Sequence, residues 1–239
     1  MLISERQRQE QDPLIVHVHM PKAGGTTLDH LLQAIYGDRL LIAHPLRGWP
    51  QEWPPEFKAM VAEKRDYYRA FSGHSAYGIH ELFQREALYI SSVRDPIDRF
   101  ESYYNFCRHW VIHHHHEVAK QSSIGEFFRY LLQRDDIELF NLQCLLLCGE
   151  KNFEAAKDFV VKRYFAIVPM RFFEPSIRLL ERRLGWQRVD IPRLNVTKHW
   201  QTVGELSPQE LKILKEGNAE DAKIVTFCEA NINHWYNAV

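Results

Sequence analysis

The sequence predicts an α/β fold built on a central parallel sheet. Short runs at 14–20, 88–93 and 164–168 are apolar and rich in β-branched or aromatic residues, as buried strands are. Segments with helical spacing of apolar residues lie between such runs, which is typical of parallel strands joined by right-handed crossovers. A length of 239 residues with 45% hydrophobic content predicts a single domain over 1–239, with 1–13 as a flexible N-terminal segment.

Capping residues mark where the helices begin. Asp95 suits an N-cap and Pro96 the first helical position, where its missing N–H costs nothing, and Ser207 followed by Pro208 repeats the signal. The expected strands are 14–20, 68–73, 88–93 and 164–168. The expected helices are 25–36, 56–64, 96–112, 122–133, 135–148, 153–162, a helix through Ile177, Leu180 and Leu184, and a terminal helix from Ser207 to Trp235.

The first strand-to-helix turn has the features of a phosphate-binding loop. Backbone N–H groups at a helix start lack intrahelical partners and point, with the positive end of the helix dipole, at whatever lies in front of them. The turn adds glycines for close backbone approach, a lysine charge and two threonine hydroxyls. The candidate ligands are Lys22, Ala23, Gly24, Gly25, Thr26 and Thr27. A purely structural glycine turn remains an alternative.

A second strand-to-helix turn follows the strand at 88–93. Arg94 leaves the strand end, and Ser102 lies about two helical turns further along the chain, where it can come near Arg94. A guanidinium binds phosphate oxygens through two aligned N–H groups, so Arg94 and Ser102 are candidate ligands of a terminal phosphate. The alternative is a surface ion pair between Arg94 and Asp95.

Together, the two turns resemble those of sulfotransferases that use 3′-phosphoadenosine 5′-phosphosulfate (PAPS). That family writes the first turn as Pro-Lys-x-Gly-(Gly/Ser/Thr)-Thr-(Thr/Ser), which residues 21–27 match. It writes the second as Arg-Asp-Pro-x-x-Arg-x-x-Ser-x-Tyr, which residues 94–104 match in the expected order.

The resemblance implies a P-loop-like three-layer α/β/α fold with PAPS as sulfuryl donor and 3′-phosphoadenosine 5′-phosphate (PAP) as product. It implies that Lys22 and the loop amides hold the 5′-phosphosulfate, with Lys22 catalytic as the donor to the leaving oxygen. Arg94 and Ser102 would hold the 3′-phosphate, and no metal would be needed.

A third element, Gly73-His74, ends the expected strand at 68–73. Its position is the carboxyl edge of the sheet, where open α/β sheets bind their ligands. In the branch of the family related to heparan sulfate and uronosyl 2-O-sulfotransferases, a histidine in this context is the catalytic base, and this resemblance leads us to expect a hydroxyl-bearing acceptor, namely a carbohydrate. An ordinary histidine pKa of about 6.5 suits that role. His80 as base, or His74 as a packed structural residue, remain open.

Two other functions compete with sulfuryl transfer. A kinase or nucleotidase that uses ATP would carry Gly-x-x-x-x-Gly-Lys-Ser/Thr, whereas here Lys22 precedes both glycines. A non-catalytic nucleotide-binding module is the third hypothesis. A formal net charge of −1 argues against nucleic acid as a partner.

The remaining signals concern location and metals. No apolar stretch is long enough for a signal peptide or membrane span, so a cytoplasmic, compact bacterial-type protein is expected. The four cysteines are expected to be reduced and mostly buried. The run His113-His114-His115-His116 is expected to be a solvated helix end or loop that binds metal only adventitiously, because neighbouring side chains point in different directions.

Two histidines near the first turn and two loops carry further local signals. His17 and His19 are expected to be residues of the first strand, although the position of His19 beside the loop leaves its role less certain. The Trp/Pro-rich loop 44–55 could stack on a sugar but is more simply a packed surface loop. A late loop resembles one that closes over the nucleotide in the family, with possible contacts at Asn195, Thr197 and Lys198.

Overall fold

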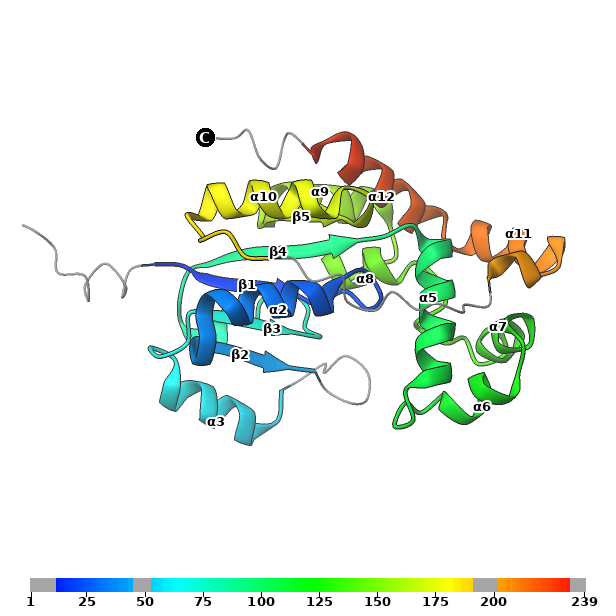
Figure 1. The fold of residues 1–239 in the computed structure, drawn as a ribbon, viewed down its shortest axis with the longest axis horizontal. Coiled ribbons are helices and arrows are strands. Elements are labelled where there is room, and N and C mark those ends of the chain that lie inside the picture. The colour runs from blue at the N-terminus through cyan, green and yellow to red at the C-terminus, as the bar shows by residue number, and fades with distance from the viewer. Residues whose placement is uncertain (1–11, 45–52, 191–201, 233–239) are drawn as a thin grey trace, which may run out of the picture.

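A parallel five-stranded sheet forms the centre of the computed structural model, which describes residues 12–44, 53–190 and 202–232. The order across the described sheet is β2-β3-β1-β4-β5, and every ladder between neighbours is parallel. The strands are β1 (Leu14–Val18), β2 (Leu40–Ala43), β3 (Ala70–Gly73), β4 (Ala87–Val93) and β5 (Tyr164–Pro169). The α/β fold with a central parallel sheet is therefore confirmed (Figure 1).

Helices flank this sheet, and the main core lies between them and the strands. The central strand β1 is buried along its whole length, as expected for a parallel strand covered on both faces. Helix α2 (Gly25–Tyr36) packs against β2 and β3, whereas α9 (Phe153–Arg163), α10 (Phe173–Leu184) and α12 (Ala219–Ala230) pack against β5 (Figure 1).

A second apolar cluster lies beyond the carboxyl ends of the strands. Helix α5 (Pro96–His109) leads from β4 into it, and α6 (His116–Gln121), α7 (Ile124–Leu132) and α11 (Pro208–Gly217) complete it (Figure 1). Its core includes Phe100, Tyr103, Tyr104, Phe127, Phe128 and Leu131. This group of helices stands at the sheet edge that carries both phosphate-type turns, so it can form one wall of a site there.

Two helix predictions are wrong in ways that turn residues explain. The helix expected over 135–148 is confined to α8 (Leu142–Cys148), because Asp135 and Asn141 have left-handed backbones with φ of 47° and 49°. The expected terminal helix is two helices, α11 and α12, separated at Asn218. The buried side-chain amide of Asn218 donates to the carbonyls of Leu139 and Leu214 at 3.0 and 2.9 Å, which fixes the break.

Smaller differences concern lengths and short elements. The strand β2 and the short helix α4 (His80–Phe83) were not expected, and α5 ends at His109 rather than at residue 112. Helix α3 (Pro55–Lys64) begins one residue early, and 122–133 corresponds to α7. Residues 1–11 and 233–235 lie outside the described part of the chain, so the expectations there are not addressed. Within the described ranges, no helix is both long and apolar enough to cross a membrane.

Candidate active site

The turn from β1 to α2 leaves the first N–H groups of α2 without protein partners. Gly24 is the N-cap with φ of 85°, no side chain caps the helix, and no acidic residue lies in its first turn. Among the described residues, the N–H groups of Gly24, Gly25 and Thr26 have no hydrogen-bond acceptor. The left-handed backbone favours glycine at position 24, and a Cβ there would also require the Met170 side chain to move. The turn therefore presents free donors at a positive helix end.

Lys22 adds a positive charge that lacks a counter-ion in the described structure. Its backbone is left-handed, with φ of 62°, and its Nζ lies 3.9 Å from the centre of the Phe106 ring on α5. Burial lowers the pKa of Lys22 to about 8. A largely desolvated ammonium group whose main contact is an aromatic ring is costly, and an anion bound beside it would offset that cost.

Arg94 connects the second turn to the first. It follows β4, and its guanidinium donates to the backbone carbonyl of Lys22 at 3.2 Å, while its own N–H donates to Gln143 Oε1 at 2.8 Å. Burial lowers the pKa of Arg94, although an arginine stays charged. Asp95 does not pair with it. The Asp95 carboxylate instead caps α5 by accepting from the N–H groups of Ile97 and Asp98 at 2.9 and 3.1 Å.

The other predicted ligands occupy the same two turns. Ala23 and Gly25 are buried, Gly24 and Thr27 are half-buried, and Thr26 is exposed. Ser102 is buried in α5 and is 5% exposed, and no contact between it and Arg94 is present among the described residues. The structure thus joins Lys22 to Arg94 directly, whereas Ser102 lies on α5, the helix that follows Arg94 in the chain, without a contact to either residue among those described.

His74 lies in a cluster of histidines at the carboxyl ends of three neighbouring strands. It follows β3, while His19 follows β1 and His44 follows β2. The ring centres are 4.4 Å apart for His19 and His44, 5.0 Å for His19 and His74, and 4.8 Å for His44 and His74. His44 carries no signal of its own in the sequence, because the short strand β2 that positions it is not predicted.

Asp29 on α2 stands behind this cluster and accepts several hydrogen bonds. The nitrogens His17 Nδ1, His19 Nδ1 and His44 Nε2 lie 3.1, 2.9 and 2.9 Å from its carboxylate, and the Ser72 hydroxyl donates to it as well. Burial alone would raise the pKa of Asp29, but these hydrogen bonds outweigh it and hold the pKa well below its usual range. The carboxylate is therefore ionised and orients the rings around it.

His74 and His19 favour their neutral forms. Burial, with smaller contributions from neighbouring rings, lowers the pKa of His74 to about 3 and that of His19 to about 4. His80, the alternative base, lies elsewhere, with its Nδ1 2.9 Å from the hydroxyl of Tyr89 on β4. The predicted strand position is confirmed for His17, whereas His19 lies just beyond the end of β1.

The histidine run after α5 is only partly solvated, which corrects the sequence expectation. His114 is exposed, but His115 and His116 are only 4% and 6% exposed. His115 Nε2 lies 2.9 Å from Asp136 Oδ2, and His116 Nδ1 lies 3.0 Å from the carbonyl of Cys107. The chain reverses direction here between α5 and α6, and this reversal brings the rings of His115 and His116 against residues of the second apolar cluster.

The other sequence expectations have mixed outcomes. All four cysteines are free, and three of them are buried, as predicted. Trp53 stacks on Phe57 with ring centres 4.3 Å apart, which supports packing rather than sugar binding for that part of the loop. Asn195, Thr197 and Lys198 lie outside the described residues, as do residues 45–52 of the Trp/Pro-rich loop.

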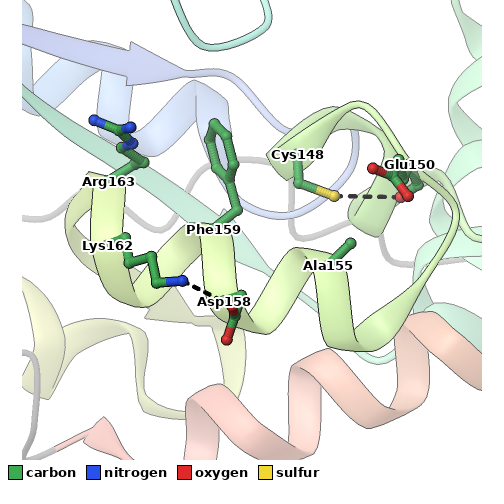
Figure 2. A pocket seen from close by; sticks show the side chains of 7 residues that line it. All are labelled: Cys148, Glu150, Ala155, Asp158, Phe159, Lys162 and Arg163. Carbon is green, nitrogen blue, oxygen red and sulfur yellow. Dashed lines mark hydrogen bonds and ion pairs between the residues drawn. The ribbon is translucent and has the colours of Figure 1, made fainter.

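A surface pocket on α8 and α9 is distinct from the two turns (Figure 2). It is lined by Cys148, Glu150, Ala155, Asp158, Phe159, Lys162 and Arg163. Lys162 Nζ lies 2.8 Å from Asp158 Oδ2, so its charge is already compensated. None of the lining residues belongs to either phosphate-type turn, and the pocket has no part in the candidate site.

Comparison with known proteins agrees with the fold and identifies the family. The structure is similar to the crystal structure of a sulfotransferase from Alicyclobacillus acidocaldarius, with a TM-score of 0.51 and 16% identity over 93% of this chain and 98% of that one. At that identity the likeness shows the fold alone. A comparison with curated protein sequences gave no match. A model of the Sulfotransferase family matches residues 7–154, which include both turns and His74. Because this match covers more than half of the sequence, the chain belongs to the sulfotransferase family, whose reaction is sulfuryl transfer.

Proposed function

We propose that the protein transfers a sulfuryl group from PAPS to an acceptor hydroxyl, with His74 as the general base. The observation that carries the proposal is Lys22: a largely desolvated cation with no counter-ion among the described residues, beside the free N–H groups of Gly24 and Gly25. Such a position favours an anionic group, and the 5′-phosphosulfate of the donor is an anion of suitable chemistry.

The link between the two turns supports a donor that carries phosphates at both ends. The Arg94 guanidinium donates to the carbonyl of Lys22, so both cations are held in one assembly. In the proposed complex, Lys22 and the amides of the loop residues hold the 5′-phosphosulfate, with Thr26 and Thr27 hydroxyls adding hydrogen bonds. Arg94 and Ser102 hold the 3′-phosphate. This arrangement predicts a preference for PAPS over ATP, which has no 3′-phosphate.

Lys22 and His74 have complementary roles in the proposed transfer. The acceptor oxygen forms a bond to sulfur as the bond between sulfur and the 5′-phosphate oxygen breaks, and the acceptor proton passes to a ring nitrogen of His74. Lys22 stabilises the negative charge that develops on the leaving oxygen. Burial keeps His74 neutral, and therefore able to accept a proton, but also makes it a weak base. Negative charge developing beside the ring would favour its protonation.

The acceptor class rests on the Gly73-His74 context. A histidine at this place resembles the branch related to heparan sulfate and uronosyl 2-O-sulfotransferases, and we therefore propose a carbohydrate hydroxyl as the acceptor. We further propose that one domain over 1–239 performs the reaction.

Calorimetric titration with PAP, using ATP and AMP as controls, tests the donor. The parent should bind PAP selectively, and Arg94→Ala should lose that selectivity while it keeps its fold. Absence of PAP binding to the parent, or equal binding of ATP, would overturn the proposal.

Turnover of His74→Ala tests the base. With a panel of carbohydrate acceptors, PAP release measures the turnover rate. His74→Ala should lower this rate about 10²–10⁴-fold and should still bind PAP. His80→Ala is the matched control, because His80 contacts Tyr89 rather than the cluster, and it should keep parental turnover. A His74→Ala protein that turns over as fast as the parent would contradict the assignment.

A further inference from the structure

Three imidazole rings meet at the carboxyl edge of the sheet in a geometry that sulfuryl transfer by a single base does not require. His19, His44 and His74 come from the ends of three neighbouring strands, and each offers a ring nitrogen within 4.8 Å of the others. Ring centres 4.4–5.0 Å apart leave little space between the side chains. Three imidazole rings this close together offer several nitrogen donor atoms to one bound ion.

A buried carboxylate orients two of these rings from behind. Asp29 is 8% exposed and contacts His19 Nδ1 and His44 Nε2, each at 2.9 Å. The opposite nitrogens, His19 Nε2 and His44 Nδ1, are not used in these contacts with Asp29. A histidine that donates one ring N–H to a carboxylate and directs its other nitrogen to a metal is the usual second-shell arrangement of zinc sites.

We propose that His19, His44 and His74 form a binding site for a divalent transition-metal ion of the Zn²⁺ class, with Asp29 as the carboxylate that orients the ligands. Three imidazole nitrogen ligands favour Zn²⁺, Co²⁺ or Ni²⁺ over Mg²⁺ or Ca²⁺, which prefer oxygen. In a tetrahedral zinc site, nitrogens about 2.0–2.1 Å from the metal lie about 3.4 Å from one another. One ring nitrogen of each histidine already lies within 4.8 Å of the others, and side-chain rotations would have to bring the ligand nitrogens to the shorter spacing.

The site has a defined relation to sulfuryl transfer. His74 would give its lone pair either to the metal or to an acceptor proton, so the two uses exclude each other if His74 is the base proposed above. A metal held by three protein ligands also keeps a fourth position for water or another oxygen ligand. His19 Nε2 lies against Gly25, since a Cβ there would be 2.4 Å from that atom, and the site therefore borders the phosphate-type loop.

A second group of ligand-type side chains provides a matched control. His114, His115 and Asp136 also lie within 4.8 Å of one another. There, however, His114 is exposed and His115 Nε2 is already engaged by Asp136 at 2.9 Å. The variant His114→Ala removes a histidine from this group without touching the proposed site.

Two titrations of the full chain, after a chelator has removed any bound metal, test the proposal. Zn²⁺ binding is measured by calorimetry, and Co²⁺ binding is measured by visible absorption. The parent should bind one Zn²⁺ tightly and give the Co²⁺ spectrum of a tetrahedral site. His44→Ala, whose side chain is 31% exposed and can be removed without a core cavity, should weaken that binding at least 100-fold. Asp29→Asn should weaken it about 10–100-fold. His114→Ala should leave it unchanged.

Several results would overturn the proposal. It is wrong if the parent binds no Zn²⁺ in this way, if His44→Ala keeps parental affinity, or if His114→Ala removes the tight site. Titration of the same samples with PAP separates this proposal from the proposed function. If the parent binds Zn²⁺ but not PAP, the metal site is supported and the proposed donor is contradicted. If it binds PAP but not Zn²⁺, the proposed donor is supported and the metal site is contradicted.

Discussion

The two strand-to-helix turns have the same architecture, but they satisfy the first N–H groups of their helices in opposite ways. Helix α2 begins after Gly24 with no side-chain cap and no acidic residue in its first turn. Helix α5 begins after Asp95, whose carboxylate accepts two backbone N–H groups, and Asp98 lies in its first turn. The first turn therefore presents unused donors and positive potential, whereas the second presents satisfied donors and negative charge.

Because of this difference, the two turns can bind anions only by different means. At the β1 to α2 turn, backbone amides and the helix dipole can hold an anion directly, with Lys22 as an added charge. At the β4 to α5 turn, Asp95 occupies the amides, so an anion must be bound by side chains such as those of Arg94 and Ser102. A similar turn in the sequence therefore does not guarantee a similar subsite.

The largest effect should come from the cation of the uncapped turn. Lys22→Met keeps most of the side-chain volume but removes the charge, and we expect kcat to fall about 10²–10³-fold, as for loss of one donor to a developing oxyanion. The same change should raise the free energy of unfolding by about 1–3 kcal/mol, because the pKa of about 8 shows that the folded state disfavours the ammonium form. PAP release kinetics and denaturant unfolding measure the two effects.

The control for that variant is Lys162→Met, on the exposed face of α9, where the lysine is paired with Asp158. It should change neither kcat nor stability appreciably. If Lys22→Met is destabilised while kcat is retained, Lys22 is a structural residue, and the anion-binding interpretation of the first turn fails.

A smaller effect should follow from changing how Arg94 binds. Arg94→Lys keeps the charge but loses the paired N–H geometry, and we expect the Kd for PAP to increase about tenfold. Binding of AMP, which has no 3′-phosphate, should change less than twofold, because the first turn is intact. Calorimetry with both ligands measures the difference. An equal loss for AMP and PAP would show that Arg94 acts through its hydrogen bond to Lys22 rather than on a 3′-phosphate.

Local sequence patterns predicted the two turns well, because their geometry depends on residues close in the chain. Gly24 at a left-handed N-cap, Asp95 as an N-cap and Pro96 at the first helical position are all properties of short segments. The same local interpretation was wrong at 135–148, because the left-handed backbones of Asp135 and Asn141 keep the chain from forming a helix before Leu142.

The histidine cluster could not be predicted locally, because it depends on tertiary pairing. His44 becomes a neighbour of His74 only because β2 pairs with β3, and β2 is a four-residue edge strand that is only partly buried. Short, half-exposed strands give a weak sequence signal. Asp29 lies on a helix that was predicted correctly, but its contact with Ser72 crosses 43 positions in sequence.

The turns should also differ in their dependence on pH. The pKa of about 8 for Lys22 means that its charge is lost as pH rises through 8, so kcat/KM should decrease up to tenfold per pH unit above that point. Arg94 stays charged throughout. On the acidic side, His74 with a pKa of about 3 should cause no decrease between pH 5 and 7. A pH profile of kcat/KM with a decrease centred near 6.5 would contradict the burial of His74 in the free protein.

The smallest effect should come from the cap of the second turn. Asp95→Ala frees the N–H groups of Ile97 and Asp98, and loss of an N-cap typically costs about 1 kcal/mol of stability. PAP binding should stay within about twofold of the parent, because removal of a carboxylate beside Arg94 cannot weaken the attraction for a phosphate. Thermal unfolding and calorimetry on the same samples test both parts. If Asp95→Ala instead loses PAP binding without loss of stability, the carboxylate contributes to the subsite directly, and the division between an amide-bound and a side-chain-bound anion is incorrect.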